Sequence, residues 1–473
     1  MFIVLLSLAE RRFWRVWRRV FSLSWPVMAE QVLRTLMRTT DLIVAGFFSP
    51  AAVAAVGLAD IYARFPLRFG IGIGDGAIAL SSQDTSADAT ANRNQAVSQA
   101  VLIGLLGGIP FILFGLLLNE YAIAVLGALT EESAMEAVIN YGSTYLMIIM
   151  ISAPAIHTNF IAARSIQGTG DTKTPMYVNG AVNALNIVLT VSLAFGLGPL
   201  PELTVIGIAV ATAVADTLGA LTFLAILWSP RSEIQFVAPR ELVITKQLML
   251  ISWPRIAEGV TEMIAEFPFN AILLAFGTEV NAAYHIGRRM YQQVASPLAR
   301  GYGVAANIMV GQSLGRNEAS TAYYNGIAAT SLSVLTIGGL CGLLFFFAEQ
   351  FVLVFTREPE TISYAVGFAQ AYAIAALLIA AYLTLAGSLR GGSETVVPFV
   401  SRVIGTFVFL LGFTYVFGVI LGYGVVAAYV AVVLDFVFRV GYLSVVFYRR
   451  RWIERGTSMM RERGSFEEQS VED

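Results

Sequence analysis

The chain has 473 residues, of which 57 % are hydrophobic and 13 % are charged, and its formal net charge is −2. A soluble domain carries about 25 % charged residues, so this composition excludes an ordinary water-soluble protein. The bilayer is therefore the expected solvent for most of the chain.

Twelve apolar stretches follow one another along the sequence. A hydrocarbon core of about 30 Å requires roughly 20 apolar helical residues, and a continuous stretch in it must be a helix because each backbone polar group has to be paired internally. We expect an all-α integral membrane protein with twelve transmembrane helices. Their approximate centres are Met37, Arg68, Gly107, Met150, Ile187, Val214, Glu262, Pro297, Ile337, Ile374, Phe409 and Val433.

Residues 1–21 form a basic segment before the first span. Its sequence RRFWRVWRR places arginines beside aromatic residues, which suits a short amphipathic helix on the anionic inner leaflet. The apolar start, Met1 to Leu8, is too short for a cleavable signal peptide and precedes the basic residues. We expect residues 1–21 to be cytoplasmic.

The rest of the chain is a repeat. Ser24 to Glu30 (SWPVMAE) recurs in the second half as Ser252 to Glu258 (SWPRIAE), and Gly168 to Pro175 is answered by Gly391 to Pro398. Repeats of this size in a membrane chain are typical of secondary transporters. We predict two parallel-repeat six-helix bundles, at residues 22–229 and 247–448, with a cytoplasmic linker at 230–246 and a cytoplasmic tail at 449–473.

The distribution of arginine and lysine predicts the topology. Both ends of the chain are rich in arginine, and alternate loops lack Lys and Arg, with Arg357 as the one exception. Cytoplasmic loops carry the excess of these residues, so both termini are expected in the cytoplasm. The tail from Arg455 onward is polar and ends acidic, and we expect it to be disordered.

Ionisable residues lie within the predicted first span, where each costs about 3 kcal/mol at the bilayer centre. Glu30, Arg34, Arg38 and Asp41 share one helical face. Two interpretations stay open: mutual ion pairs, Glu30 with Arg34 and Arg38 with Asp41, or a water-filled cavity that binds a coupling ion or a cationic substrate. Asp41 is the strongest candidate for binding such a cation because it lies deep in its span.

The seventh span carries a stripe of carboxylates. Glu258, Glu262 and Glu266 follow at intervals of four, so a proton, a metal cation or arginines from elsewhere must relieve their repulsion; candidates for the last are Arg288, Arg289 and Arg402. In the last span, Asp435 and Arg439 are spaced to form an ion pair. Other motifs are weak: no Walker loop is present, and His157 and His285 lack metal-ligand spacing.

With these landmarks, residues 22 to 448 resemble a multidrug and toxic compound extrusion (MATE) transporter of the prokaryotic type. The resemblance rests on Pro26 followed by Asp41 and Gly46, on Ala51 to Gly57, on Gly170 to Pro175 before Asn186-Ile187, and on Val310 to Gly315. It implies a V-shaped pair of six-helix lobes that exports organic cations or amphipathic drugs in exchange for Na⁺ or H⁺.

The resemblance also implies site residues. Asp41, Asn186 and Thr212 match an ion site that would suit Na⁺, and Pro26 matches a proline that helps the first helix bend. The family has a second aspartate where this chain has Thr190. Either Asp41 acts with polar oxygens alone, or charge is supplied from elsewhere, or the coupling ion has changed.

Another branch of the family uses a glutamate that matches Glu262. Its partner aspartate in the tenth span is missing here, and Glu266 shares the stripe. Arg34 and Arg38 are unusual beside Asp41, where they would hold the carboxylate ionised or weaken its affinity for a cation.

We therefore expect a secondary active multidrug antiporter working by alternating access, and not an enzyme. It would need no cofactor beyond the coupling ion, would act as a monomer in the plasma membrane on a small-molecule drug, and would bind no nucleic acid. The alternative is a lipid or lipid-linked oligosaccharide flippase of the same superfamily. The basic set that favours it is Arg34, Arg38, Arg64 and Arg68.

Overall fold

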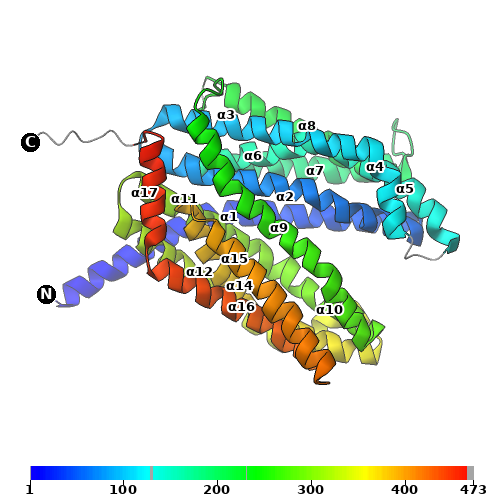
Figure 1. The fold of residues 1–473 in the computed structure, drawn as a ribbon. Helices are drawn as coiled ribbons and strands as arrows, with labels where there is room; N and C mark the ends of the chain where they lie inside the picture. Colours follow the sequence, from blue (N-terminus) through cyan, green and yellow to red (C-terminus); the bar gives the residue numbers. More distant parts are fainter. Residues whose placement is uncertain (1, 128–131, 231, 466–473) are drawn as a thin grey trace, which may run out of the picture. The chain divides into compact units, whose positions relative to one another are not determined.

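The computed structural model describes residues 2–127, 132–230 and 232–465 (Figure 1). All regular secondary structure in these residues is helical, which confirms the all-α prediction. The first half contains α1 (Phe2–Phe48), α2 (Pro50–Ser86), α3 (Thr90–Gly107), α4 (Ile109–Gly127), α5 (Glu132–Ile151), α6 (Ala153–Thr169), α7 (Lys173–Phe195) and α8 (Thr204–Trp228).

The second half repeats this series with more interruptions. It contains α9 (Leu242–Phe276), α10 (Thr278–Met290), the π-helix η1 (Tyr291–Ala295), α11 (Ser296–Gly315), α12 (Ala319–Phe346), α13 (Ala348–Val352), α14 (Pro359–Gly391), α15 (Val396–Ile404), the π-helices η2 (Gly405–Gly412) and η3 (Thr414–Ile420), α16 (Val425–Tyr448) and α17 (Arg451–Glu462). Both halves contain helices that follow one another with short breaks; α5 and α6, for example, meet at a bend of 49°.

Apolar composition alone identifies fewer crossings. Within the described residues, eight helices are long and apolar enough to span a membrane, or nine if the bent α5–α6 pair is one span. The helices α1 and α2 do not pass this test, although each is longer than a bilayer requires. Both helices carry ionisable side chains in their middle. Such residues are costly to insert into a bilayer, so they are candidates for a functional role.

The chain divides into two compact units. The N-unit comprises Ala29–Ser81 and Thr90–Ser252, and the C-unit comprises the residues up to Met28, Ser82–Ala89 and the chain from Trp253 onward. The start of α1 thus packs with the second half, and the start of α9 packs with the first half. The predicted boundaries at 22–229 and 247–448 do not include this exchange.

Each exchange is built on a serine of the repeated SWP motif and a glycine. In the C-unit, a Cβ at Gly301 would lie 2.9 Å from the carbonyl oxygen of Ser24. In the N-unit, a Cβ at Gly76 would lie 2.6 Å from Oγ of Ser252. At Gly301 the neighbouring atom is backbone, so a larger residue would separate the helices, whereas at Gly76 the hydroxyl of Ser252 would have to turn away.

The connector between α8 and α9 runs from residue 229 to 241, shorter than the predicted 230–246, and it lies on α3. The backbone N–H of Gln235 donates to Oδ1 of Asn94 at 3.1 Å, and that of Val237 donates to Oγ of Ser98 at 2.9 Å. Gln99 donates to the carbonyl of Glu241 at 3.1 Å. Since polar side chains of α3 satisfy part of its backbone, the connector belongs to the N-unit.

Both terminal predictions need correction. The basic segment is not a separate short helix, because α1 runs unbroken from Phe2 through Pro26 to Phe48. The tail is not disordered from Arg455, because α17 continues to Glu462 with Trp452 and Met460 buried. Its apolar face, rather than its overall polarity, decides that it folds. The end of the predicted tail, residues 466–473, lies outside the described residues.

A fully buried ion pair holds the end of α17. Arg463 contacts Asp84 at 2.7 Å, and Ser465 also donates to this carboxylate, at 2.8 Å. Arg463 donates to Gln83 as well, and Gln83 donates to the carbonyl of Gly391 at 2.7 Å. The final turn of α2 is thereby bound to α14 and α17 within the C-unit.

Candidate ion-coupling sites

Two polar stripes face each other inside the N-unit. The stripe on α1 is the predicted set from Glu30 to Asp41, and the stripe on α7 consists of Asn179, Asn183, Asn186 and Thr190, all buried. Asn179 donates to Glu30 at 3.1 Å and Thr190 donates to Asp41 at 3.2 Å. The two helices are therefore parallel and in contact over about three turns.

The structure brings together the four residues expected around the first ion site. The hydroxyl of Thr190 lies 3.2 Å from Oδ1 of Asp41 and 3.3 Å from Oδ1 of Asn186, and Nδ2 of Asn186 donates to Thr212 at 3.1 Å. One hydroxyl proton cannot serve both acceptors at once. The site thus holds more acceptor oxygens than donors, as a site for a small cation requires.

Asp41 is 7 % exposed and forms no ion pair within the described residues. Arg38 acts on its carboxylate only through space. Arg34 points to another partner, since its guanidinium lies 5.5 Å from the ring of Phe160. The predicted pair of Arg38 with Asp41 is wrong, because the α7 stripe supplies neutral partners for the carboxylate.

The predicted pair of Glu30 with Arg34 is also wrong. Glu30 is 2 % exposed, and it accepts hydrogen bonds from Nε2 of Gln167 at 3.2 Å and Nδ2 of Asn179 at 3.1 Å. Pro26 lies one turn before it, inside α1, where a proline removes a backbone hydrogen bond. The chain passes from the C-unit to the N-unit between Met28 and Ala29.

In the C-unit, arginines pair with the carboxylates of the stripe formed by Glu258, Glu262 and Glu266. Glu258 contacts Arg390 at 2.7 Å, Arg255 at 3.1 Å and Arg402 at 3.3 Å, and it accepts a hydrogen bond from Tyr382 at 2.8 Å. Three guanidinium groups therefore surround one carboxylate.

The other two glutamates of the stripe share two arginines. Glu266 contacts Arg288 at 3.0 Å, and Glu262 lies 3.9 Å from Arg402 and 4.0 Å from Arg288. Relief by Arg288 and Arg402 is confirmed, whereas Arg289 lies over the ring of Phe355.

The ion pair expected between Asp435 and Arg439 is also confirmed. It is buried, and Arg439 additionally donates to Thr406 at 2.8 Å.

The two glutamate pockets are copies of one another. Glu30 and Glu258 are corresponding residues of the SWP repeat, and their donors Gln167 and Arg390 directly precede the corresponding glycines Gly168 and Gly391. The same alignment of the two halves matches Asn179 with Arg402. Sequence reasoning missed this equivalence, although the two repeated motifs already contained it.

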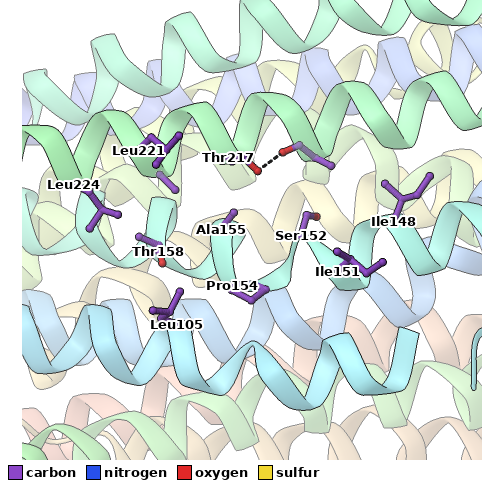
Figure 2. Close-up of a pocket in the computed structure, with 12 residues that line it drawn as sticks. Leu105, Ile148, Ile151, Ser152, Pro154, Ala155, Thr158, Thr217, Leu221 and Leu224 are labelled. Carbon is purple, nitrogen blue, oxygen red and sulfur yellow. Dashed lines mark hydrogen bonds between the residues drawn. The ribbon is translucent and has the colours of Figure 1, made fainter. Parts of the chain in front are cut away.

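A surface cavity of the N-unit lies apart from these residues. It has a volume of about 460 Å³ and lies at the α5–α6 bend, lined by Leu105, Ser152, Pro154, Thr158, Leu221 and others (Figure 2). Its lining is mostly apolar and contains none of the predicted site residues. In the described part of the chain, no group of three or more His, Cys, Asp or Glu side chains is arranged to hold a metal ion.

A helical membrane protein made of two like halves, each with ionisable residues in its interior, belongs to the class of secondary transporters. The sequence profile of the MatE family matches residues 26–192 and 254–416, one match in each half. The chain belongs to the MatE family, and its twelve transmembrane helices form two six-helix repeats.

Two NorM relatives match most of the chain. A probable multidrug resistance protein NorM of Thermotoga maritima is 26 % identical over 464 residues, which cover 94 % of this chain and 95 % of that protein. The multidrug resistance protein NorM of Vibrio cholerae is 26 % identical over 409 residues, covering 84 % and 87 %.

Solved structures share the fold. A MATE crystal structure in complex with MaD3S has a TM-score of 0.83 at 19 % identity, covering 94 % of this chain and 97 % of that one. A MOP superfamily transporter of Pyrococcus furiosus, described as having a binding pocket of reverse polarity, has a TM-score of 0.83 at 18 % identity, covering 94 % and 96 %.

Proposed function

We propose that this protein is a multidrug efflux antiporter that exports organic cations or amphipathic drugs in exchange for H⁺ or Na⁺. Family membership and the NorM relatives support transport of drugs. The observation that carries the coupling is Asp41, a buried carboxylate whose direct partner is a neutral hydroxyl. A carboxylate in this setting gains most from binding a cation, because no arginine compensates it directly.

The coupling follows from differential binding. A cation at Asp41 and a cationic drug in the same unit would favour different conformations, and each would shift the equilibrium by its difference in affinity for the two states. Alternating access needs no covalent step and no cofactor. The protein would act as a monomer in the plasma membrane with both termini in the cytoplasm, as the arginine distribution predicts.

The test is ethidium efflux from proteoliposomes with an imposed pH gradient or an imposed Na⁺ gradient, one at a time. Wild-type export driven by one gradient identifies the coupling ion.

Asp41→Asn should lower gradient-driven export by about 100-fold, since the variant keeps the hydrogen bond to Thr190 but loses the charge that attracts the cation. Glu120→Gln, a change of the same kind at an exposed carboxylate of the N-unit, is the matched control and should export like the wild type.

A lipid or lipid-linked oligosaccharide flippase is the second candidate, and one observation favours it. The three arginines around Glu258 leave the C-unit pocket with an excess of positive charge, which suits a phosphate group. Absence of ethidium export under both gradients, together with scrambling of a fluorescent phospholipid by the same proteoliposomes, would replace the antiporter proposal with this one.

A further inference from the structure

The N-unit contains another carboxylate one helical turn beyond the Asp41 group. Asp216 lies on α8, four residues after Thr212, so the two side chains share a face of the helix. Thr212 accepts the hydrogen bond of Asn186. A polar path therefore leads from Asp41 on α1 through hydrogen bonds of α7 to Thr212, and Asp216 follows one turn along the same face of α8.

Asp216 is held by an amide that retains an unused acceptor. Nδ2 of Asn159, on α6, donates to Oδ1 of Asp216 at 3.0 Å. Oδ1 of the same amide is buried without a hydrogen-bond partner, and Asn159 is only 3 % exposed. A buried acceptor without a donor is unfavourable unless a ligand satisfies it. The carboxylate and the amide oxygen together form an acceptor pair in the interior of the unit.

The local packing is built around this amide. A Cβ at Gly219 on α8 would come within 2.9 Å of Nδ2 of Asn159. The glycine thus makes room for the amide against α8, one turn from Asp216. The amide thus packs against α8, and its hydrogen bond to Asp216 orients Nδ2 toward the carboxylate.

The corresponding helix of the C-unit, α16, carries an ion pair where α8 carries a single carboxylate. When the two halves are aligned on Gly168 and Gly391, Thr212 corresponds to Asp435 and Asp216 corresponds to Arg439. Arg439 is neutralised by Asp435 one turn earlier, but the residue one turn before Asp216 is an uncharged threonine. Within the described residues Asp216 forms no ion pair.

Two arginines act on Asp216 through space, Arg34 and Arg38, and both are shared with other carboxylates. Arg34 interacts electrostatically with both Glu30 and Asp216. Its guanidinium lies over the ring of Phe160, 5.5 Å from the centroid. Arg38 also acts on Asp41. Among the described residues, two guanidinium groups thus face three carboxylates, Glu30, Asp41 and Asp216, without an ion pair to any of them, which leaves negative charge for a cation.

We propose that Asp216 and Asn159 form a second binding site for the coupling cation, in place of the aspartate that the family resemblance leads one to expect at Thr190. This inference rests on the proposed antiport. The second acidic group has moved from α7 to the facing turn of α8, so the cation transferred from Asp41 is received one turn along the same polar path. The ligand is a small monovalent cation, Na⁺ or H⁺, bound through oxygen atoms.

The experiment measures export from proteoliposomes as a function of the concentration of the coupling ion. Asp216→Asn should raise the ion concentration for half-maximal export by about 5-fold or more, because the variant keeps the shape and the contact with Asn159 but loses the charge. The double variant Asp216→Asn with Thr190→Asp places a carboxylate at the position where the family is expected to have one. It should restore the ion concentration for half-maximal export to within about 3-fold of wild type. Asp216→Asn with Thr190→Asn is the matched control without the charge and should not restore it.

The outcomes separate the two proposals. Wild-type ion dependence in folded Asp216→Asn protein overturns this inference and leaves the antiport intact, as does a loss that Thr190→Asp fails to restore. No export by the wild type under either gradient overturns both.

If the Asp216 variants do not fold, the variant Asn159→Ala decides. A rise of about 3-fold in the half-maximal ion concentration supports the second site, and an unchanged value excludes it. Binding of radioactive Na⁺ to the purified protein, lowered by both variants, would identify Na⁺ rather than H⁺ as the ligand.

Discussion

Glu30 and Glu258 occupy corresponding positions of the two repeats, but their pockets differ in charge. Glu30 is held by the neutral amides of Gln167 and Asn179. Glu258 is held by arginines at the two positions that correspond to those amides, and by a third on its own helix. The geometry of the pocket is therefore a property of the repeat, whereas its charge is specific to each half.

The difference extends along the same helices. When the halves are aligned on the SWP motif, the positions of Arg34 and Arg38 on α1 correspond to Glu262 and Glu266 on α9. In the C-unit these glutamates contact arginines of other helices. In the N-unit, Asp41 retains only neutral direct partners among the described residues. The C-unit thus neutralises its carboxylates with arginines, whereas the described part of the N-unit leaves Asp41 without an arginine in contact.

The largest effect should come from removing the charge of each glutamate in turn. Glu258→Gln would leave the buried Arg390 without a carboxylate contact and should lower the free energy of unfolding by about 5 kcal/mol. Glu30→Gln loses one hydrogen bond to a neutral amide and should cost about 1–3 kcal/mol. Denaturation of the purified protein in mixed micelles measures both. Equal losses would show that the charge difference between the pockets does not affect stability.

A second comparison concerns the glutamines at the ends of α2 and α11. Gln83 accepts a hydrogen bond from Arg463, and Gln312 accepts one from Arg19 at 2.6 Å. Of these two arginines, Arg463 also pairs with a buried carboxylate, that of Asp84. Arg463→Ala should therefore lower the free energy of unfolding by about 3 kcal/mol, because Asp84 would keep Ser465 as a partner but lose its counter-charge.

Arg19→Ala is the control for Arg463→Ala. Arg19 is exposed, so its loss should cost about 0.5–1.5 kcal/mol, the value of one hydrogen bond. Denaturation in mixed micelles compares the two variants. If Arg19→Ala were as destabilising as Arg463→Ala, the buried pair with Asp84 would contribute nothing beyond the hydrogen bond to Gln83.

Much of the fold could be predicted because its determinants are local. Span lengths, the SWP repeat and the glycine landmarks are visible in the sequence, and the helices follow from them. The amphipathic helix α17 was missed because its net polarity hides an apolar face carrying Trp452 and Met460. The exchange of helix starts between the units was missed because it depends on contacts between distant residues.

The candidate site was predicted in part for the same reason. Asp41, Thr190 and Asn186 could be placed together from the resemblance, and their contacts agree with that placement. The ion pairs assigned to Glu30 and Asp41 were wrong, since spacing along one helix cannot reveal the amides that a neighbouring helix supplies. Asp216 was not recognised, because nothing local to it indicates its position beside the α7 stripe.

The smallest effect tests whether the C-unit pocket can tolerate the chemistry of the N-unit. Arg390→Gln recreates at Glu258 the amide that Gln167 provides to Glu30, and Arg255 and Arg402 still compensate the carboxylate. The loss should be about 1 kcal/mol, the difference between a charged and a neutral hydrogen bond, and gradient-driven export should stay within about 2-fold of wild type. Denaturation in mixed micelles and proteoliposome efflux measure the two quantities. A collapse of export with stability preserved would mean that the excess positive charge of the C-unit pocket takes part in transport, and would favour a substrate that carries a phosphate.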